Sequence, residues 1–349
     1  MRQPALQSKP KIIFTAPKIT QGFMTHDIAL MSPYVDVIPI DLSECSGALR
    51  YTYFVKLWRG LARERAQVVF CYFVLAKYTP LLATLVRSLR RKLMIVTGGI
   101  DATYVPDIHW GDMGHPLYRR LFAYVMRLSD SVLPFSNSSR DDLLQYGKPR
   151  RIRTAYLAVD TDTFRPGAQP RARRAVTACY AISKDALLQK GVEPFVQAAA
   201  LVPDMEFVVV GEFVDDTLDD LKAQATPNVR FTMRRYNKHE CAELYQSAAV
   251  YVQASAHEGF GVSLAEAMAC GCVPVVAKRY ALPETIGDTG YSVPFNDPAA
   301  LAQAIQEAMT HPDKGEAARQ RVVENFTEAK RQQLLREELE FVLGRSLGA

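Results

Sequence analysis

Two glutamates in the second half of the chain are spaced to face one ligand. The segment from Ala254 to Val276 reads ASAHEGFGVSLAEAMACGCVPVV, in which seven residues separate Glu258 from Glu266. A carboxylate only accepts hydrogen bonds and can take two at once, which suits the hydroxyl groups of a sugar. The glycines between the two glutamates let the backbone approach a ligand closely. A helix that begins near Ser263 would add free amides for an anion such as a diphosphate.

The second glutamate also has a purely structural explanation. Ser263 is followed three residues later by Glu266. This is the pattern of a capping box, in which the glutamate folds back onto the serine amide. A glutamate at this distance from a serine is more often part of a helix cap than a ligand. The spacing alone leaves both interpretations open.

Short apolar runs that alternate with helical patterns must position these residues. This alternation predicts parallel sheets with helices on both faces, and ligands in such folds bind outside the carboxyl ends of the strands. The predicted strands are Lys11–Thr15, Val35–Ile40, Val68–Phe73, Leu93–Thr97, Ser131–Pro134, Ala175–Tyr180, Glu206–Val210, Asn228–Thr232, Ala249–Gln253 and Val273–Val276. The predicted helices include Leu81–Arg91, Leu117–Leu128, Val192–Leu201, Leu218–Ala223, His239–Ser247, Ser263–Ala269, Pro298–Met309 and Thr327–Leu343.

The length of the chain predicts two domains. Its 349 residues exceed what one ordinary core organises. The run Thr161–Ala175 is rich in Pro, Arg and small residues and has no period, which indicates an interdomain linker. We therefore expect a first domain over residues 1–165, a second over 170–326, and a helix over 327–349 that packs back on the first domain.

The composition is that of a globular protein. Hydrophobic residues make up 48% of the chain, and no stretch approaches the ~18–20 apolar residues that span a bilayer. The N-terminus is polar before its first apolar run, so it lacks the hydrophobic region of a signal peptide. The six cysteines have no zinc-finger spacing, which favours reduced thiols. These features predict a cytoplasmic protein without a structural metal.

The glutamate segment as a whole resembles a known signature. E-GFGVSLA-E followed by AMACGCVPVV is similar to the donor-site motif of the retaining glycosyltransferases of family 4, the group-1 transferases. In that family, two glutamates seven residues apart frame the donor sugar. The resemblance covers Ala178 to Pro294 strongly and Gly98 to Leu144 more loosely, and it rests on topology alone over residues 1–90. It implies the GT-B fold, with two Rossmann-like, doubly wound domains that face a cleft.

The resemblance also implies roles for individual residues. Glu258 would contact the donor sugar, and Glu266 would hold the ribose hydroxyls. Lys190 would neutralise the donor diphosphate, where departure of the leaving group builds negative charge. The family usually has an arginine where this chain has Ser183 and Lys184. The other donor-binding residues implied are Gly211, Tyr236, Gly259, Phe260, Gly261, Val262 and Ser263.

The first half departs further from the family. Many members carry a histidine just after the strand that corresponds to Leu93–Thr97, and this chain has glycine there. Asp101 matches an acidic residue of related members, and we expect it in the cleft as a catalytic group together with Glu258 and Lys190. The predicted loops for the acceptor or the phosphates contain Gly22, Gly98, Gly99 and His109.

The resemblance implies transfer of a sugar, with retention, from a nucleotide-diphosphate sugar to a hydroxyl of a glycan or a lipid-linked acceptor. UDP- and GDP-sugars are favoured over ADP-sugars as donor, and no cofactor or metal is expected. A sugar-nucleotide-modifying enzyme such as a 2-epimerase, or a catalytically silent donor-binding module, would share the same pattern. A dehydrogenase is disfavoured because no G-x-G-x-x-G opens a helix after a strand. Nucleic-acid binding is disfavoured because the basic residues follow no recognised motif.

The basic first half predicts an anionic partner. The net charge is +5, and the positive charge is concentrated in residues 1–170. The segment RYTYFVKLWRGLARER, from Arg50 to Arg65, mixes aromatic and basic residues in a way that fits a helix at an anionic membrane surface. Arg87, Arg90, Arg91 and Lys92 would add to that surface. The alternative is a solvated helix whose aromatic residues face the core. The hypothesis is a peripheral protein at the inner face of the cell membrane that builds cell-surface glycans.

Overall fold

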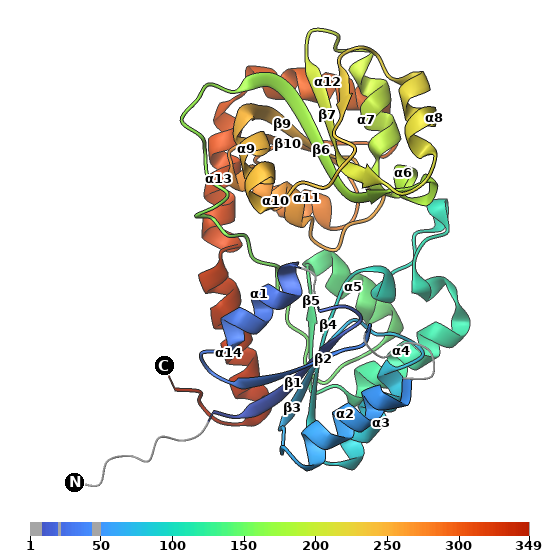
Figure 1. Cartoon of the computed structure of the whole chain (residues 1–349), viewed down its shortest axis with the longest axis vertical. Helices are drawn as coiled ribbons and strands as arrows, with labels where there is room; N and C mark the ends of the chain where they lie inside the picture. The colour runs from blue at the N-terminus through green and yellow to red at the C-terminus, as the bar shows by residue number, and fades with distance from the viewer. Residues whose placement is uncertain (1–8, 20–21, 44–49, 349) are drawn as a thin grey trace, which may run out of the picture. The chain divides into compact units, whose positions relative to one another are not determined.

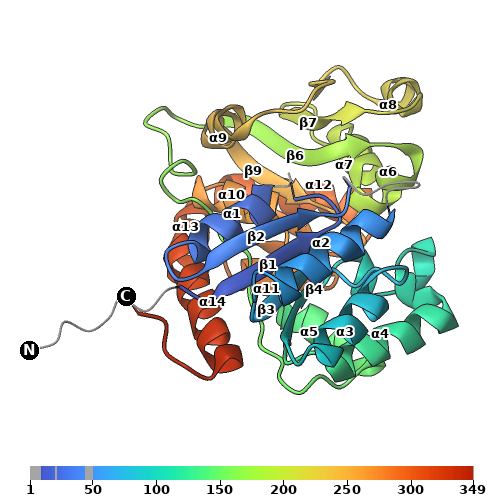
Figure 2. The same cartoon turned by 60° about the horizontal axis from the view of Figure 1, so that its bottom comes forward.

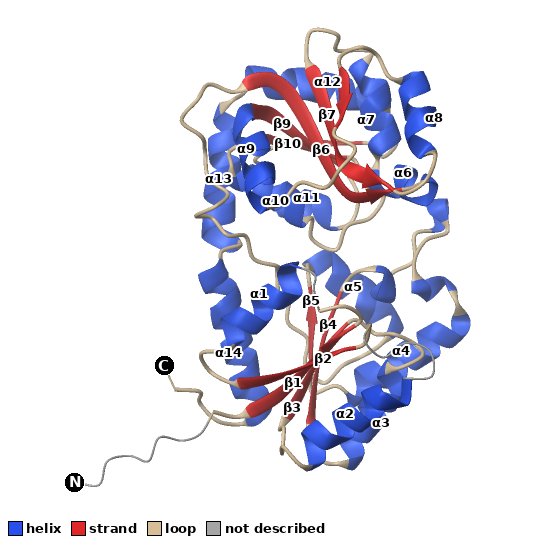
Figure 3. Cartoon of the chain, in the orientation of Figure 1, coloured by secondary structure: helices blue, strands red, loops and turns tan. Residues whose placement is uncertain are grey.

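The chain folds as two compact units. The computed structural model describes residues 9–19, 22–43 and 50–348. Unit 1 comprises the residues up to Tyr156 together with those from Ala329 onward, and unit 2 comprises Leu157–Glu328. Each unit contains one parallel sheet that is flanked by helices (Figures 1 and 3). The fold class predicted from the alternation of strands and helices is therefore confirmed, with two Rossmann-like sheets.

The sheet of unit 1 has the order β2-β1-β3-β4-β5. All its pairings are parallel, and the central strand β3 is buried along its whole length, as its uninterrupted apolar sequence requires. The strands are β1 (Lys11–Ala16), β2 (Asp36–Asp41), β3 (Val68–Tyr72), β4 (Lys92–Thr97) and β5 (Ser131–Pro134). The helices are α1 (Gly22–Met31), α2 (Arg50–Ala62), α3 (Thr79–Ser88), α4 (Pro116–Leu128), α5 (Asn137–Tyr146) and α14 (Glu328–Leu343), with short turns η2 (Ile100–Ala102), η3 (Pro106–Ile108) and η4 (Asp112–Gly114).

Different helices cover the two faces of this sheet. Helices α2, α3 and α4 bury Leu57, Leu82 and Phe122 in the core on one face. Helices α1 and α14 lie on the other face (Figures 1 and 2). There Arg331 of α14 donates to both carboxylate oxygens of Asp27 in α1, at 3.0 and 2.7 Å. The predicted return of the C-terminal helix to the first domain is confirmed.

The sheet of unit 2 has the order β11-β10-β9-β6-β7-β8, and all its pairings are parallel. This is the strand order of the doubly wound nucleotide-binding folds. The strands are β6 (Ala172–Ile182), β7 (Glu206–Phe213), β8 (Val229–Phe231), β9 (Ala248–Gln253), β10 (Val273–Ala277) and β11 (Tyr291–Val293). The helices are α6 (Lys184–Lys190), α7 (Val192–Ala199), α8 (Thr217–Gln224), α9 (Lys238–Ser247), α10 (Val262–Ala269), α11 (Ala281–Ile286), α12 (Pro298–Thr310) and α13 (Asp313–Asn325).

The helices of unit 2 also divide between the two faces of its sheet. Helices α7, α8 and α12 pack together on one face, whereas α10 packs with α9 and α13 on the other. Several details differ from the sequence prediction, which also lacked helices α6, α11 and α13. Strand β6 begins at Ala172, inside the segment predicted as a linker, and the three-residue strand β11 was not predicted. Within the described ranges, no helix combines the length and the apolar character that crossing a bilayer requires.

Candidate functional site

The strand order of unit 2 places a topological switch point between β6 and β9. These two strands are neighbours in the sheet, but the chain after β6 continues through α6 to α7 and the chain after β9 continues to α10. Because α7 and α10 lie on opposite faces, the two connections diverge at the carboxyl ends of the strands. One connection ends in Lys190, and the other contains Glu258. The topology thus brings together two residues that are far apart in the sequence.

Glu258 is held at only one of its two carboxylate oxygens. Its Oε1 accepts hydrogen bonds from Lys190 Nζ at 2.9 Å, Ser255 Oγ at 2.9 Å and Gln253 Nε2 at 3.1 Å. Within the described residues no hydrogen bond reaches Oε2, and the side chain is 16% exposed. The fold therefore fixes the direction of this carboxylate and leaves one acceptor oxygen for a ligand.

Lys190 reaches Glu258 because helix α6 ends against strand β9. The next residue, Gly191, has φ of +66°, and a Cβ there would lie 2.1 Å from the carbonyl oxygen of Ala254. Only glycine allows this close approach. Burial alone would lower the pKa of Lys190, but the charge of Glu258 outweighs it and raises the pKa. Lys190 is therefore a protonated side chain that is held in place beside Glu258.

Helix α10 begins without a side-chain cap. Its N-cap is Gly261, whose φ of +90° is in the left-handed region, and no side chain bonds the first amides. Val262, Ser263 and Leu264 form the first turn, so their amides have no partner within the helix. The capping-box interpretation is wrong, because Glu266 stands at the fifth helical position, beyond the reach of an N-cap amide. A helix start with open amides is the kind of element that can bind an anion, and this one follows the loop that carries Glu258.

Glu266 is the fifth residue of helix α10, and its side chain is partly buried. Burial raises its pKa to about 8, while the nearby Lys238 lowers it and Asp160 raises it. Lys238 and Asp160 form an ion pair with each other. Burial first, and then the charges of both Glu258 and Glu266, raise the pKa of the buried Tyr251. Both carboxylates therefore lie close enough to act on one phenol.

The other residues predicted for donor binding have varied surroundings. Ser183 is the N-cap of α6 and accepts from the Ala186 amide at 3.3 Å. Lys184 is exposed in the first turn of that helix. Gly211 lies in β7, where a Cβ would be 2.5 Å from a carbonyl oxygen of β6. Tyr236 lies beneath the guanidinium of Arg234, 4.6 Å from the ring centroid. Gly259 and Phe260 lie in the loop before α10, and Phe260 is buried.

The residues predicted for the first domain all lie in unit 1. Asp101 is fully buried, and its carboxylate accepts from Thr97 Oγ1 at 2.5 Å, the Val74 amide at 2.8 Å and the Gly99 amide at 3.2 Å. The carbonyl of Gly98 accepts from Ser139 at 3.2 Å. His109 is exposed, with Nδ1 3.2 Å from Tyr104 Oη. Gly22 is the first residue of α1, directly after two residues outside the described ranges.

Sequence reasoning missed the polar residues that precede Glu258. Gln253 and Ser255 are buried and anchor its carboxylate. His257 is 3% exposed and packs against Tyr280, with ring centroids 4.5 Å apart, and burial lowers its pKa to about 4. The signal was a polar residue at every second position where an apolar strand ends. Among the residues that the structure describes, no group of three His, Cys, Asp or Glu gathers as a metal site would.

Comparison with known proteins agrees with this geometry. Residues 178–328 match the family described as glycosyl transferases group 1. The chain is 29% identical over 233 residues to alpha-maltose-1-phosphate synthase from Mycolicibacterium smegmatis, covering 57% of this chain and 60% of that one. It is 27% identical over 194 residues to the GDP-mannose-dependent alpha-(1-6)-phosphatidylinositol dimannoside mannosyltransferase from Mycobacterium tuberculosis strain H37Ra, covering 53% of this chain and 50% of that one. The match thus spans only half to three fifths of the length of these two relatives.

The fold similarity extends over nearly the whole chain. The crystal structure of sucrose-phosphate synthase from Thermosynechococcus elongatus superposes with a TM-score of 0.77 at 18% identity. The superposition covers 96% of this chain and 100% of that one, so both units share its architecture. The group-1 match includes Lys190, the uncapped start of α10 and both glutamates. Unit 2 is therefore similar to the group-1 glycosyltransferases over residues 178–328, and both units share the two-domain fold of the superposed structure.

Proposed function

We propose that the protein is a retaining glycosyltransferase that transfers a sugar from a nucleotide-diphosphate sugar to a hydroxyl group of a glycan or a lipid-linked acceptor. Unit 2 would bind the donor, and unit 1 would bind the acceptor. One observation carries the proposal: Glu258 presents an unoccupied carboxylate oxygen beside the uncapped start of helix α10. A hydroxyl-bearing ring joined to a diphosphate matches that pair of features.

The diphosphate of the donor would be bound by two sources of positive charge. The amides at the start of α10 point their hydrogens outward, and Lys190 supplies a full charge. In the ligand-free protein Lys190 is paired with Glu258. A bound diphosphate would share the ammonium group, which has three donors. The sugar hydroxyls would then bind Oε2 of Glu258, while the ribose hydroxyls would reach Glu266.

The chemistry would proceed without a metal ligand from this chain. The bond between the anomeric carbon and the diphosphate oxygen breaks, and its electron pair stays on the diphosphate. The acceptor oxygen forms the new bond to the anomeric carbon and loses its proton to the departing phosphate oxygen. Lys190 and the α10 amides stabilise the charge that develops there. Glu258 orients the sugar, because its anchored carboxylate is held by three donors and is a poor nucleophile.

A binding and turnover experiment separates this function from its alternatives. Saturation with the right nucleotide should stabilise the protein by about 2.7 kcal/mol at 100 times its Kd. UDP, GDP and ADP are compared by thermal shift, with Glu266→Ala as the variant expected to lose the shift. A 2-epimerase would convert the nucleotide sugar without an acceptor, as followed by NMR. A catalytically silent module would bind the nucleotide sugar but would transfer no sugar to any acceptor, so no free nucleotide diphosphate would appear. Absence of a shift with all nucleotides would refute donor binding itself.

One of the relatives supports a choice of nucleotide for the donor. The mannosyltransferase named above is GDP-mannose-dependent and acts on a phosphatidylinositol dimannoside. We propose a UDP- or GDP-sugar as donor here, and a lipid-linked or membrane-bound glycan as acceptor. The acceptor proposal has independent support in the surface of unit 1, where helix α2 exposes apolar residues.

Helix α2 has an apolar stripe that is exposed to solvent. Tyr51, Val55 and Trp58 are 81%, 62% and 46% exposed, and their spacing of four and three residues places them on one face of the helix. Leu57 and Leu61 on the opposite face are fully buried. The predicted amphipathic helix therefore has two apolar sides, one in the core and one in solvent. An exposed apolar stripe beside basic residues is typical of a helix at an anionic membrane surface.

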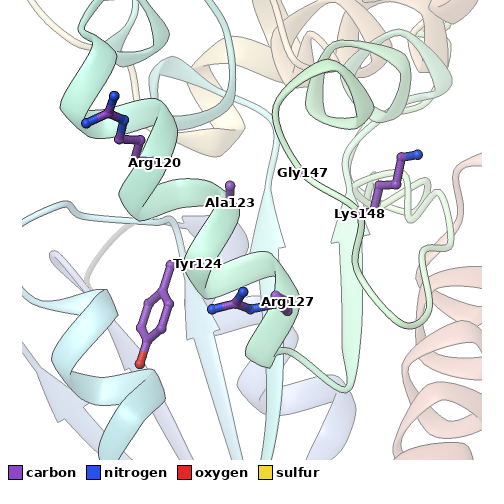
Figure 4. Close-up of a pocket in the computed structure, with 6 residues that line it drawn as sticks. All are labelled: Arg120, Ala123, Tyr124, Arg127, Gly147 and Lys148. Atoms are coloured by element: carbon purple, nitrogen blue, oxygen red, sulfur yellow. The ribbon is translucent and has the colours of Figure 1, made fainter.

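An open pocket on the same layer of helices adds positive charge. It has a volume of about 500 Å³ and lies between α4 and the segment after α5 (Figure 4). Arg120 and Arg127 extend from α4, and Lys148 follows α5, with no carboxylate among the lining residues. Tyr124 of α4 joins this pocket to α3 through its 2.9 Å contact with Thr84. Anionic headgroups complement such a surface.

Vesicle sedimentation tests this membrane contact. The protein should sediment with vesicles that contain phosphatidylglycerol and stay in solution with pure phosphatidylcholine. Replacing Tyr51, Val55 and Trp58 together by Ser should lower the bound fraction at least fivefold. The matched control replaces Leu201 and Val214, which are exposed in unit 2, by Ser. Equal sedimentation of both variants, or sedimentation that ignores lipid charge, would refute a peripheral location through this helix.

A further inference from the structure

Three segments of unit 2 meet at one phenylalanine. Phe326 follows helix α13, and its ring packs edge-on against Phe260, with centroids 5.0 Å apart and an interplanar angle of 79°. Both side chains are only 2% exposed. The carbonyl of Phe326 accepts a hydrogen bond from the Val159 amide at 2.8 Å. A parallel bridge between Val159 and Thr327 continues this contact.

The contacts of Phe326 lie close to the two points where the chain crosses from one unit to the other. The chain passes between the two units directly after residue 156 and again directly after residue 328. Val159 lies beside the first passage, and Phe326 lies beside the second. Phe260 lies in the loop that also carries Glu258, before the start of α10. A single residue therefore links the loop at the candidate donor site to both passages, through its ring to Phe260 and through its backbone carbonyl to Val159.

The loop is held to this point by a second set of contacts. The hydroxyl of Thr285 donates to the carbonyl of Phe260 at 2.7 Å. Arg321 of α13 donates to the carbonyls of Glu284 and Thr285, at 2.6 and 2.8 Å. Its guanidinium carbon also lies 5.8 Å from the centroid of the Phe326 ring. Because packed interiors transmit small displacements, a shift of the loop must move Phe326 or break these contacts.

We propose that Phe326 is a positioning residue that couples the state of the loop around Phe260 to the two segments where the chain passes between its units. This inference rests on the proposed function, because it takes the nucleotide diphosphate as the ligand that orders the loop. A bound diphosphate fixes the start of α10 and the preceding Phe260. The ring of Phe326 then orders the backbone at residues 157–163 and 324–330. Donor binding would thereby order these two segments, through which the chain connects the two units.

Hydrogen exchange of the full chain tests the coupling. UDP and GDP serve as probes, each at saturation. In the wild type the nucleotide should slow amide exchange at least fivefold in peptides covering 258–264, 157–163 and 324–330. In Phe326→Leu, protection of 258–264 should remain and the nucleotide Kd should change less than threefold. Protection of 157–163 should disappear, and kcat should fall about tenfold with KM unchanged.

The control makes the same change elsewhere in the unit. Phe195→Leu removes a fully buried ring that packs on Phe207 at 5.0 Å on the opposite face of the sheet. This variant should lose stability but keep the nucleotide-dependent protection at 157–163. Thr285→Val serves as a milder second variant, because it removes the donor to the Phe260 carbonyl and preserves the side-chain volume. It should weaken the protection at 157–163 without abolishing it.

The outcomes separate this inference from the function on which it rests. If the nucleotide protects 258–264 in the wild type and leaves 157–163 and 324–330 unchanged, the donor site stands and the coupling is refuted. The coupling is also refuted if Phe195→Leu lowers the protection at 157–163 as much as Phe326→Leu does. If neither nucleotide protects 258–264, donor binding fails and the coupling falls with it.

Discussion

Two carboxylates that follow parallel strands, one in each unit, differ in how their oxygens are used. Asp101 follows β4 and accepts at both oxygens, Oδ2 from Thr97 and Val74 and Oδ1 from Gly99. Glu258 follows β9 and accepts all three of its hydrogen bonds at Oε1. In unit 1 both oxygens of the Asp101 carboxylate are hydrogen-bonded within the fold. In unit 2 the Oε2 atom of Glu258 is left open. Residue type and position after a parallel strand alone would not separate these two cases.

Individual helix starts differ in the same way, although each unit contains both kinds: α3 in unit 1 also lacks a side-chain cap, and α9 in unit 2 has a full capping box. In unit 1, His115 caps α4, and Ser136 caps α5 by accepting from the Ser139 amide at 3.0 Å. In unit 2, Gly261 leaves the first amides of α10 without a side-chain cap. An uncapped start costs stability unless a ligand supplies the missing acceptor. An uncapped helix start alone does not mark a site, and α10 stands out because Glu258, with one open carboxylate oxygen, lies in the loop before it.

The largest effect is expected for Glu258→Gln. The amide can accept at one atom only, so either the Lys190 anchor or the open acceptor is lost. Turnover should fall by about 10²–10³, the magnitude typical for one preorganised group at a reacting centre. The nucleotide Kd should change less than threefold, because the diphosphate contacts remain. Steady-state kinetics with calorimetric binding checks this, and a variant with normal kcat would contradict the role of the open oxygen.

Asp101→Asn should affect stability instead of chemistry. The amide can keep its oxygen toward Thr97 and Val74, but its NH2 group then faces the Gly99 amide, which loses its acceptor. The flipped amide loses the other two hydrogen bonds instead. Such a loss costs about 1–3 kcal/mol. For a unit of this size, each kcal/mol lowers Tm by roughly 2–4 °C. Calorimetry gives the Tm, and kcat per folded molecule should stay within threefold. A normal Tm together with a collapse of kcat would instead make Asp101 the catalytic group predicted from the family.

The pH dependence of stability tests the setting of Glu266. Burial raises its pKa to about 8 in the folded protein, whereas the unfolded side chain ionises near its ordinary value of about 4.3. Between those values the folded state binds more protons, so this group makes stability fall as the pH rises. Gln does not titrate. Three pH units of a one-proton difference correspond to about 4 kcal/mol, so the Tm of Glu266→Gln relative to wild type should rise by about 8 °C between pH 5 and pH 8.5. A constant difference would contradict a protonated Glu266.

The sequence was sufficient for the architecture and for the family, because both follow from local patterns. Apolar runs such as Val68–Phe73 can only be buried strands, and the E-GFGVSLA-E segment is contiguous. It was insufficient for the state of each polar atom, which depends on non-local contacts. The anchoring of Glu258 by Lys190 joins residues on different crossovers, and the saturation of Asp101 requires an amide from β3's loop. The capping-box error has the same origin, because the N-cap is Gly261 and lies two residues before Ser263.

The smallest effect is expected at Ser183, which the family resemblance placed in the donor site. Its hydroxyl already accepts from the Ala186 amide as the N-cap of α6. Ser183→Ala should therefore cost about 1 kcal/mol of stability and change the nucleotide Kd less than twofold. Ser183→Asp is the matched control, because aspartate restores the cap and should recover the stability. Suppose instead that Ser183→Ala weakens nucleotide binding tenfold and that Ser183→Asp does not restore it. The Ser183 hydroxyl would then bind the nucleotide in addition to capping α6. The contrast between consumed and open polar groups would then fail inside unit 2 itself.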